Sequence, residues 1–144
     1  MQQKPRALAL VLATLAGAAV PTLAVCSLML FFREEDGWIT WLGYVAALTF
    51  GIALVHLALL GLPAVAWLFA KQKFRAWTMM LVGALVAMIP VSLLALPGAP
   101  WGDQGDTWGD WVEILLVFAP IGALSALAFY YVCRAMTKKA PAAA

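Results

Sequence analysis

The chain has 144 residues, of which 65% are hydrophobic and 11% are charged, and its formal net charge is +2. A soluble domain of this size would have to expose large apolar patches, so the composition excludes an ordinary water-soluble protein. We expect a lipid bilayer as its solvent and no nucleic acid among its partners.

Four apolar runs are long enough to cross a bilayer, which takes roughly 20 helical residues. They are Ala7 to Phe32, Trp38 to Ala70, Ala76 to Leu96 and Ile114 to Cys133. Backbone polar groups are costly when unpaired in hydrocarbon, so each run should be α-helical. The sequence thus predicts an all-α integral membrane protein in which residues 1–144 form a single four-helix transmembrane domain. Its helices should cover approximately 7–32, 40–70, 76–97 and 108–135, with a disordered tail at 140–144.

Two of the three connections between these runs are short. Arg33 to Gly37 and Lys71 to Arg75 are about five residues each, and links of that length place their flanking helices side by side and antiparallel. The predicted arrangement is therefore an up-down-up-down antiparallel bundle.

Charge divides the connections into two groups. Eight of the nine basic residues should lie on one side of the membrane: Lys4, Arg6, Lys71, Lys73, Arg75, Arg134, Lys138 and Lys139. Arg33 should lie on the other side with every carboxylate of the chain: Glu34, Glu35, Asp36, Asp103, Asp106, Asp110 and Glu113. By the positive-inside rule, both termini and the 71–75 connection are cytoplasmic, and we expect a bacterial inner (cytoplasmic) membrane.

Aromatic residues should form a belt at each membrane surface. The outer belt comprises Trp38, Trp41, Tyr44, Trp101, Trp108 and Trp111, and the inner belt comprises Trp67, Trp77, Tyr130 and Tyr131. Each helix also holds one interior proline, which predicts bent helices: Pro21, Pro63, Pro90 and Pro120.

Small residues recur four positions apart on three of the predicted helices. The pairs are Ala13 and Gly17, Gly83 and Ala87, and Gly122 and Ala126. Such pairs allow helix backbones to approach closely in lipid. We expect them to serve packing within this chain, with a partner's helix as the alternative.

His56 is the one ionisable side chain predicted near the middle of the membrane, where such a group is by default a candidate functional residue. Thr22 and Ser125 fall at similar depth, so the three could form a midplane polar cluster. The simpler interpretation is a hydrogen bond between helices, to a hydroxyl or to the Leu59 carbonyl that Pro63 leaves free. The other is a proton relay or a substrate contact.

The sequence favours no cofactor, no metal and no catalytic centre. Haem ligation by helices usually needs two histidines, and no Cys, Asp or Glu lies near His56 on its helix to share a metal. Nucleophilic catalysis also wants a base with an orienting third group, which His56 lacks. Cys26 and Cys133 should lie at opposite leaflets, too far apart for a disulfide.

The segment from Pro97 to Trp111 combines tryptophans, aspartates and glycines. Its acidic spacing does not fit a calcium loop. It is either an interfacial belt, with a short helix starting near Asp106 or Thr107, or a recognition surface, since exposed tryptophan is a common interface anchor. The candidate outer-loop contact surface comprises Trp101, Asp103, Asp106, Trp108, Asp110 and Trp111.

Two functions remain open. The first is a small multi-pass protein without a catalytic centre that acts by protein–protein contact, with a membrane-protein partner or with itself. It would be an accessory subunit or a protective, immunity-like factor. The alternative is an oligomeric channel or transporter subunit whose path is lined by His56, Thr22 and Ser125.

Overall fold

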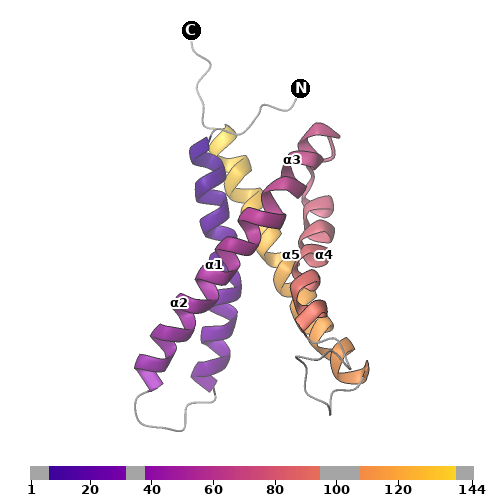
Figure 1. The fold of residues 1–144 in the computed structure, drawn as a ribbon. Coiled ribbons are helices and arrows are strands. Elements are labelled where there is room, and N and C mark those ends of the chain that lie inside the picture. The colour runs from indigo at the N-terminus through magenta and orange to yellow at the C-terminus, as the bar shows by residue number, and fades with distance from the viewer. Residues whose placement is uncertain (1–6, 32–37, 95–107, 139–144) are drawn as a thin grey trace.

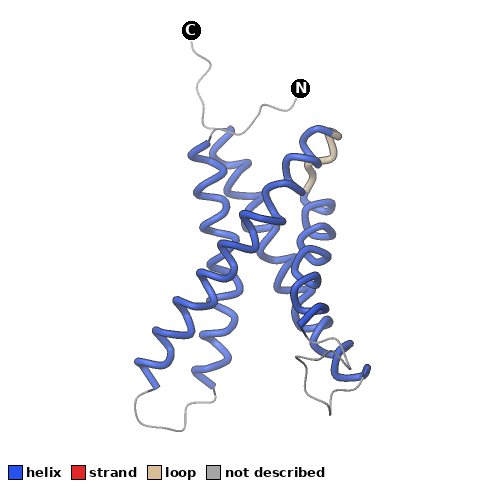
Figure 2. The backbone as a smooth tube through the Cα atoms, in the orientation of Figure 1, coloured by secondary structure: helices blue, strands red, loops and turns tan. Residues whose placement is uncertain are grey.

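A computed structural model describes residues 7–31, 38–94 and 108–138 of the chain. Within these ranges every segment is helical except the turn at 71–75, and there is no strand (Figure 2). The elements are α1 (Ala7–Phe31), α2 (Trp38–His56), a π-helical turn η1 (Leu57–Gly61), α3 (Leu62–Ala70), α4 (Ala76–Leu94) and α5 (Trp108–Lys138). The predicted all-helical architecture is confirmed for these residues, whereas the 140–144 tail lies outside them.

Three helical stretches are long and apolar enough to cross a membrane. They are Ala7–Leu30, Ile39–Ala70 and Trp111–Thr137, with mean hydropathies of 2.2, 2.3 and 2.2. The apolar part of α4, Ala76–Pro90, is shorter. The structure therefore supports a membrane-embedded protein, and the fourth crossing stays a prediction.

The second membrane-length stretch is one continuous helix built from α2, η1 and α3. Pro63 has no N–H to donate, and its ring would clash with the carbonyl of residue 59 in a regular α-helix. The turn before it widens instead, and the Leu62 N–H bonds to the Leu57 carbonyl five residues earlier. Directly before Pro63, where a bend was predicted, the structure has a π-turn that keeps the helix unbroken.

The helices alternate in direction and form an open arrangement (Figure 1). Helix α5 packs against both α1 and α4, and α2 packs against α1. The start of α1, the end of α5 and the 71–75 turn lie at one end of the molecule, here called the turn end. Toward the other end, the far end, α2 diverges from α4 and α5 (Figure 1).

The hydrophobic core lies at the turn end. It comprises Ala13, Val65, Leu68, Phe74, Met79, Ala126, Phe129, Tyr130 and Cys133. The Phe74 ring stacks on Phe69 with ring centroids 4.0 Å apart and lies 5.2 Å from the ring of Tyr130. The turn between α3 and α4 is thereby fastened to α5.

Tyr130 differs from the other aromatic residues of the predicted inner belt. Trp67, Trp77 and Tyr131 are 56%, 66% and 58% exposed, as a belt requires. Tyr130 is only 7% exposed, because its ring faces Phe74 and its hydroxyl accepts a hydrogen bond from Arg134 Nη1 at 3.0 Å. It belongs to the core.

Small residues bring α4 and α5 into backbone contact. A Cβ on Gly83 would overlap the Ala126 methyl and lie 2.6 Å from the Gly122 carbonyl oxygen, and a Cβ on Gly122 would overlap the Ala87 methyl. The two pairs therefore interlock reciprocally. On α1, a Cβ on Gly17 would lie 3.3 Å from the Ser125 carbonyl oxygen. The prediction that these pairs pack within the chain is confirmed.

Candidate functional site

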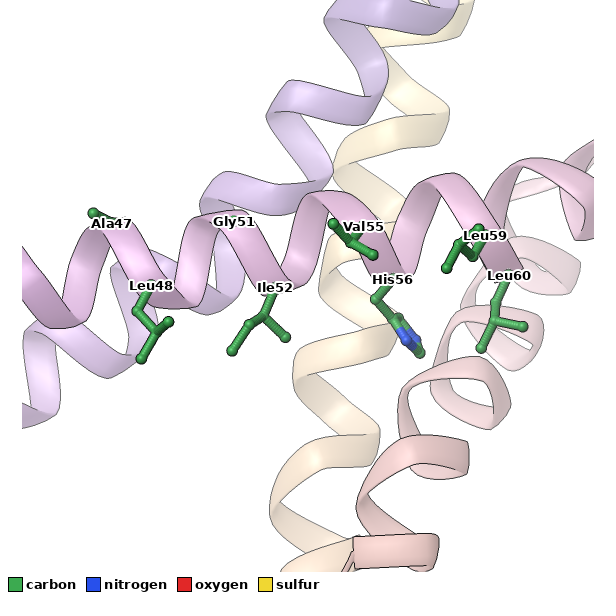
Figure 3. A pocket seen from close by; sticks show the side chains of 8 residues that line it. All are labelled: Ala47, Leu48, Gly51, Ile52, Val55, His56, Leu59 and Leu60. Atoms are coloured by element: carbon green, nitrogen blue, oxygen red, sulfur yellow. The ribbon is translucent and has the colours of Figure 1, made fainter.

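A hollow of about 630 Å³ runs along one face of α2 and η1 (Figure 3). Its lining residues recur at intervals that place them on one side of a helix. They are Ala47, Leu48, Gly51, Ile52, Val55, His56, Leu59 and Leu60, and together we call them the α2 face.

The α2 face is apolar, and the described part of the chain leaves most of it uncovered. Leu48, Ile52, Val55 and Leu59 are 51%, 62%, 58% and 68% exposed. In the most apolar 18 residues of Ile39–Ala70 no residue is buried, whereas 22% are buried in the corresponding window of Ala7–Leu30 and 28% in that of Trp111–Thr137. The buried residues of Ile39–Ala70 are Val65 and Leu68 of α3, so the α2 part of the stretch adds no buried side chain to the core.

Small residues follow this helix at intervals of four: Gly43, Ala47 and Gly51. A Cβ added to Gly43 or to Gly51 would meet no atom of the described residues within 4 Å, apart from its chain neighbours and the adjoining backbone of its own helix. The same spacing brings α4 and α5 together through Gly83 and Gly122. On α2, no helix among the described residues packs against Gly43 or Gly51, although α1 contacts other residues of α2. This stripe was not among the small-residue pairs predicted from the sequence, although its four-residue spacing was the signal that could have identified it.

His56 is the last residue of α2, directly before the π-turn. Its imidazole points to the same side of the helix as Ile52 and Leu60 (Figure 3). The Nε2 atom is buried and has no hydrogen-bond partner among the described residues. At this atom, therefore, the interhelical hydrogen bond of the simpler interpretation is not formed.

Thr22 and Ser125 are engaged on their own helices. Thr22 Oγ1 donates to the Ala18 carbonyl at 3.0 Å, and Ser125 Oγ donates to the Ile121 carbonyl at 2.9 Å. Hydroxyls of Ser and Thr commonly make such bonds to the preceding turn in helices. Each donor is thus used locally, and the midplane cluster with His56 stays a prediction.

The residues predicted for the outer-loop contact surface fall into two groups. Trp101, Asp103 and Asp106 lie outside the described residues. Trp108, Asp110 and Trp111 lie in the first turn of α5. For Asp110, the structure describes the backbone but not the side chain.

The two described tryptophans of this surface differ in surroundings. Their rings meet edge to face with centroids 5.8 Å apart. Trp108 is 64% exposed. Trp111 Nε1 donates to the Ser92 carbonyl of α4 at 3.2 Å. Ser92 lies in the last turn of α4, where backbone carbonyls have no N–H of their own helix to accept from. Trp111 therefore joins α5 to α4, and Trp108 is the better candidate for outside contact.

The chemistry of the described residues is limited. No group of three His, Cys, Asp or Glu side chains in residues 7–31, 38–94 and 108–138 is placed to hold a metal ion. The α2 face offers apolar surface, small residues and one imidazole. It is suited to contact with another apolar surface that carries a hydrogen-bonding group.

Comparison with other proteins gives no family. No protein-family model, curated protein or solved structure significantly matches this chain.

Proposed function

We propose that this protein is a multi-pass protein of a bacterial inner membrane that acts by contact between helices within the bilayer. It has no catalytic centre and serves as an accessory subunit or as a protective, immunity-like factor for a membrane protein. The chain crosses four times, with both termini and the 71–75 turn in the cytoplasm, as the distribution of its basic residues favours.

The uncovered α2 face is the observation that carries this proposal. In lipid the hydrophobic effect does not drive helices together, so close packing of small residues and interhelical hydrogen bonds take its place. Gly43, Ala47 and Gly51 offer the packing surface that Gly83 and Gly122 use inside the chain. The occupant we propose is an apolar transmembrane helix of a partner protein.

His56 adds a polar feature to this surface. Its Nε2 atom is buried and unpaired among the described residues, which is unfavourable in an apolar environment. If the His56 side chain rotates toward the partner helix on binding, a hydroxyl or amide side chain of that helix at the same depth relieves this cost. Interhelical hydrogen bonds of this kind contribute about 0.6 kcal/mol on average.

Copurification in mild detergent tests the proposal. Ala47→Leu and Gly51→Leu fill the stripe and should release the bound membrane protein. Ala58→Leu is the matched control, because Ala58 is exposed on the same helix but does not line the hollow. Equal retention by all three variants would remove the basis for the α2 face as the contact surface. If the retained protein is a second, differently tagged copy of this chain, the contact is self-association.

One observation favours the alternative, an oligomeric channel or transporter subunit. A histidine within a membrane span and beside a π-turn, with its Nε2 atom unpaired among the described residues, is typical of functional sites. Thr22 and Ser125 would line the same path, although both hydroxyls already bond to their own helices. Solute or proton flux in liposomes should then fall on His56→Ala, and unchanged flux argues against this function.

A further inference from the structure

The turn at the end of α3 presents three cations and buries the residue between two of them. Lys71, Lys73 and Arg75 are exposed, whereas Phe74 is only 8% exposed. Phe74 packs between Phe69 of α3 and Tyr130 of α5. The aromatic side chain thus anchors the turn, and its basic neighbours point outward.

Backbone hydrogen bonds hold this turn in one shape. Gln72 adopts a left-handed conformation with φ of 55°, and the Lys73 N–H bonds to the Leu68 carbonyl at 2.9 Å. Thr78 Oγ1 accepts the Arg75 N–H at 3.2 Å and donates to the Lys73 carbonyl. The three cations are therefore carried on a fixed backbone.

A fourth cation, Arg134 of α5, is linked to the turn through Tyr130. Arg134 is exposed, and its Nη1 atom donates to the hydroxyl of Tyr130, whose ring faces Phe74. The guanidinium carbon also lies 5.9 Å from the centre of the Tyr130 ring. Arg134 is thereby tied to the aromatic residues that anchor the turn.

Nothing acidic in the described part of the chain is close enough to neutralise these cations. Glu113, the one acidic side chain that the structure describes, lies near the start of α5, at the far end. The exposed rings of Trp67 and Trp77 flank the turn in sequence, on α3 and α4. Tryptophan prefers the depth of lipid headgroups, so the cluster should lie at that depth.

We propose that Lys71, Lys73, Arg75 and Arg134 form a binding site for the phosphate of an anionic phospholipid headgroup. Lysine binds phosphate as a point charge, and arginine can donate two parallel hydrogen bonds to it. Basic clusters between membrane helices attract anionic headgroups in this way. This inference is independent of the proposed protein contact, because it concerns the turn end and not the α2 face.

Native mass spectrometry of the full chain in neutral detergent tests the site. The probes are phosphatidylglycerol, phosphatidylcholine with the same acyl chains, and inorganic phosphate alone. Phosphatidylglycerol should bind in preference to phosphatidylcholine, and inorganic phosphate should neither bind measurably nor displace it at equal concentration. Each neutralised cation should weaken phosphatidylglycerol binding by about fivefold, since a surface Lys or Arg contributes about 1 kcal/mol to such attraction.

Two sets of variants separate a site from a general effect of charge. K71Q/K73Q/R75Q should lose the preference for phosphatidylglycerol, whereas K4Q/K138Q/K139Q, with the same loss of charge, should keep it. K71R/K73R should also keep it, which guards against a misfolded variant. Equal binding of both lipids, or an equal loss in both triple variants, would overturn the proposal.

Discussion

His56 is the one residue in the described part of the chain with a buried side-chain polar atom that lacks a hydrogen-bond partner. A buried polar atom without a hydrogen bond costs about 1–3 kcal/mol. In the isolated protein, His56→Leu should therefore raise the free energy of unfolding by about 1 kcal/mol. Chemical denaturation in detergent measures this change. Ser125→Ala is the control and should not raise stability, because the Ser125 hydroxyl already has a partner. A clear loss of stability in His56→Leu would mean that the imidazole is satisfied within the chain.

Thr78 has a different role, since its hydroxyl connects three backbone groups of the 71–75 turn. Thr78→Val should lower the free energy of unfolding by about 1–2 kcal/mol, because it removes the acceptor of the Arg75 N–H at the start of α4 and leaves turn carbonyls without this donor. Thr14→Val is the matched control, as the Thr14 hydroxyl bonds only to the Leu10 carbonyl within α1. Its effect should stay within about 0.5 kcal/mol. Equal losses in the two variants would show that the turn does not depend on Thr78.

Sequence patterns predicted some of these residues better than others. Trp67 and Trp77 are exposed at the turn end, as the composition of an aromatic belt indicates. Tyr130 is buried because Phe74 folds back from the turn onto it, and a contact between residues so far apart in sequence has no local signal. The missing hydrogen bond at His56 Nε2 likewise depends on which side of α2 the other helices cover.

Among the elements, α4 and α5 form the closest helix pair, and their contact depends on the absence of side chains. Gly83→Ala should destabilise the protein by about 1–3 kcal/mol, because the new methyl would overlap Ala126 and approach the backbone of Gly122. The same change at Gly43 meets open space and should leave stability unchanged or raise it by up to about 1 kcal/mol through helix propensity. Equilibrium unfolding in detergent compares the two. If Gly43→Ala were the more destabilising variant, the assigned packing would be wrong.

The element formed by α2, η1 and α3 was predictable in extent but not in detail. An unbroken apolar run predicted one helix over approximately 40–70, and Ile39–Ala70 is membrane-length and continuous. The effect of Pro63 was predicted as a bend, but a π-turn meets the same constraint by shifting the hydrogen bond of Leu62 to Leu57. Whether the helix bends or forms a π-turn depends on the hydrogen bonds of the turn before Pro63. No residue type in that turn distinguishes the two outcomes in the sequence.

At the scale of the whole molecule, the lengths of the hydrophobic runs were sufficient to predict the class of fold. In lipid, a helix pairs its backbone polar groups within one segment. The run lengths were not sufficient for the site. The α2 face is recognisable only because no described helix packs against most of it. Gly43 and Gly51 stand at the small-residue spacing found on α4 and α5, where Gly83 and Gly122 are in close helix contact. The glycines of α2 lack a neighbour of this kind because α2 diverges from α4 and α5 toward the far end (Figure 1).

We propose that the chain crosses the membrane four times with its basic end in the cytoplasm. Helix α4 is the most demanding part of this topology, because its apolar stretch, Ala76–Pro90, is the shortest. Labelling of single cysteines with a membrane-impermeant reagent, in a background without Cys26 and Cys133, tests it directly. Cysteines at Lys73 and Ala142 should react only in inside-out vesicles, and a cysteine at Asp106 only in intact cells with a permeable outer layer. Reaction of positions 73 and 106 from the same side would contradict the account, because α4 would then not cross.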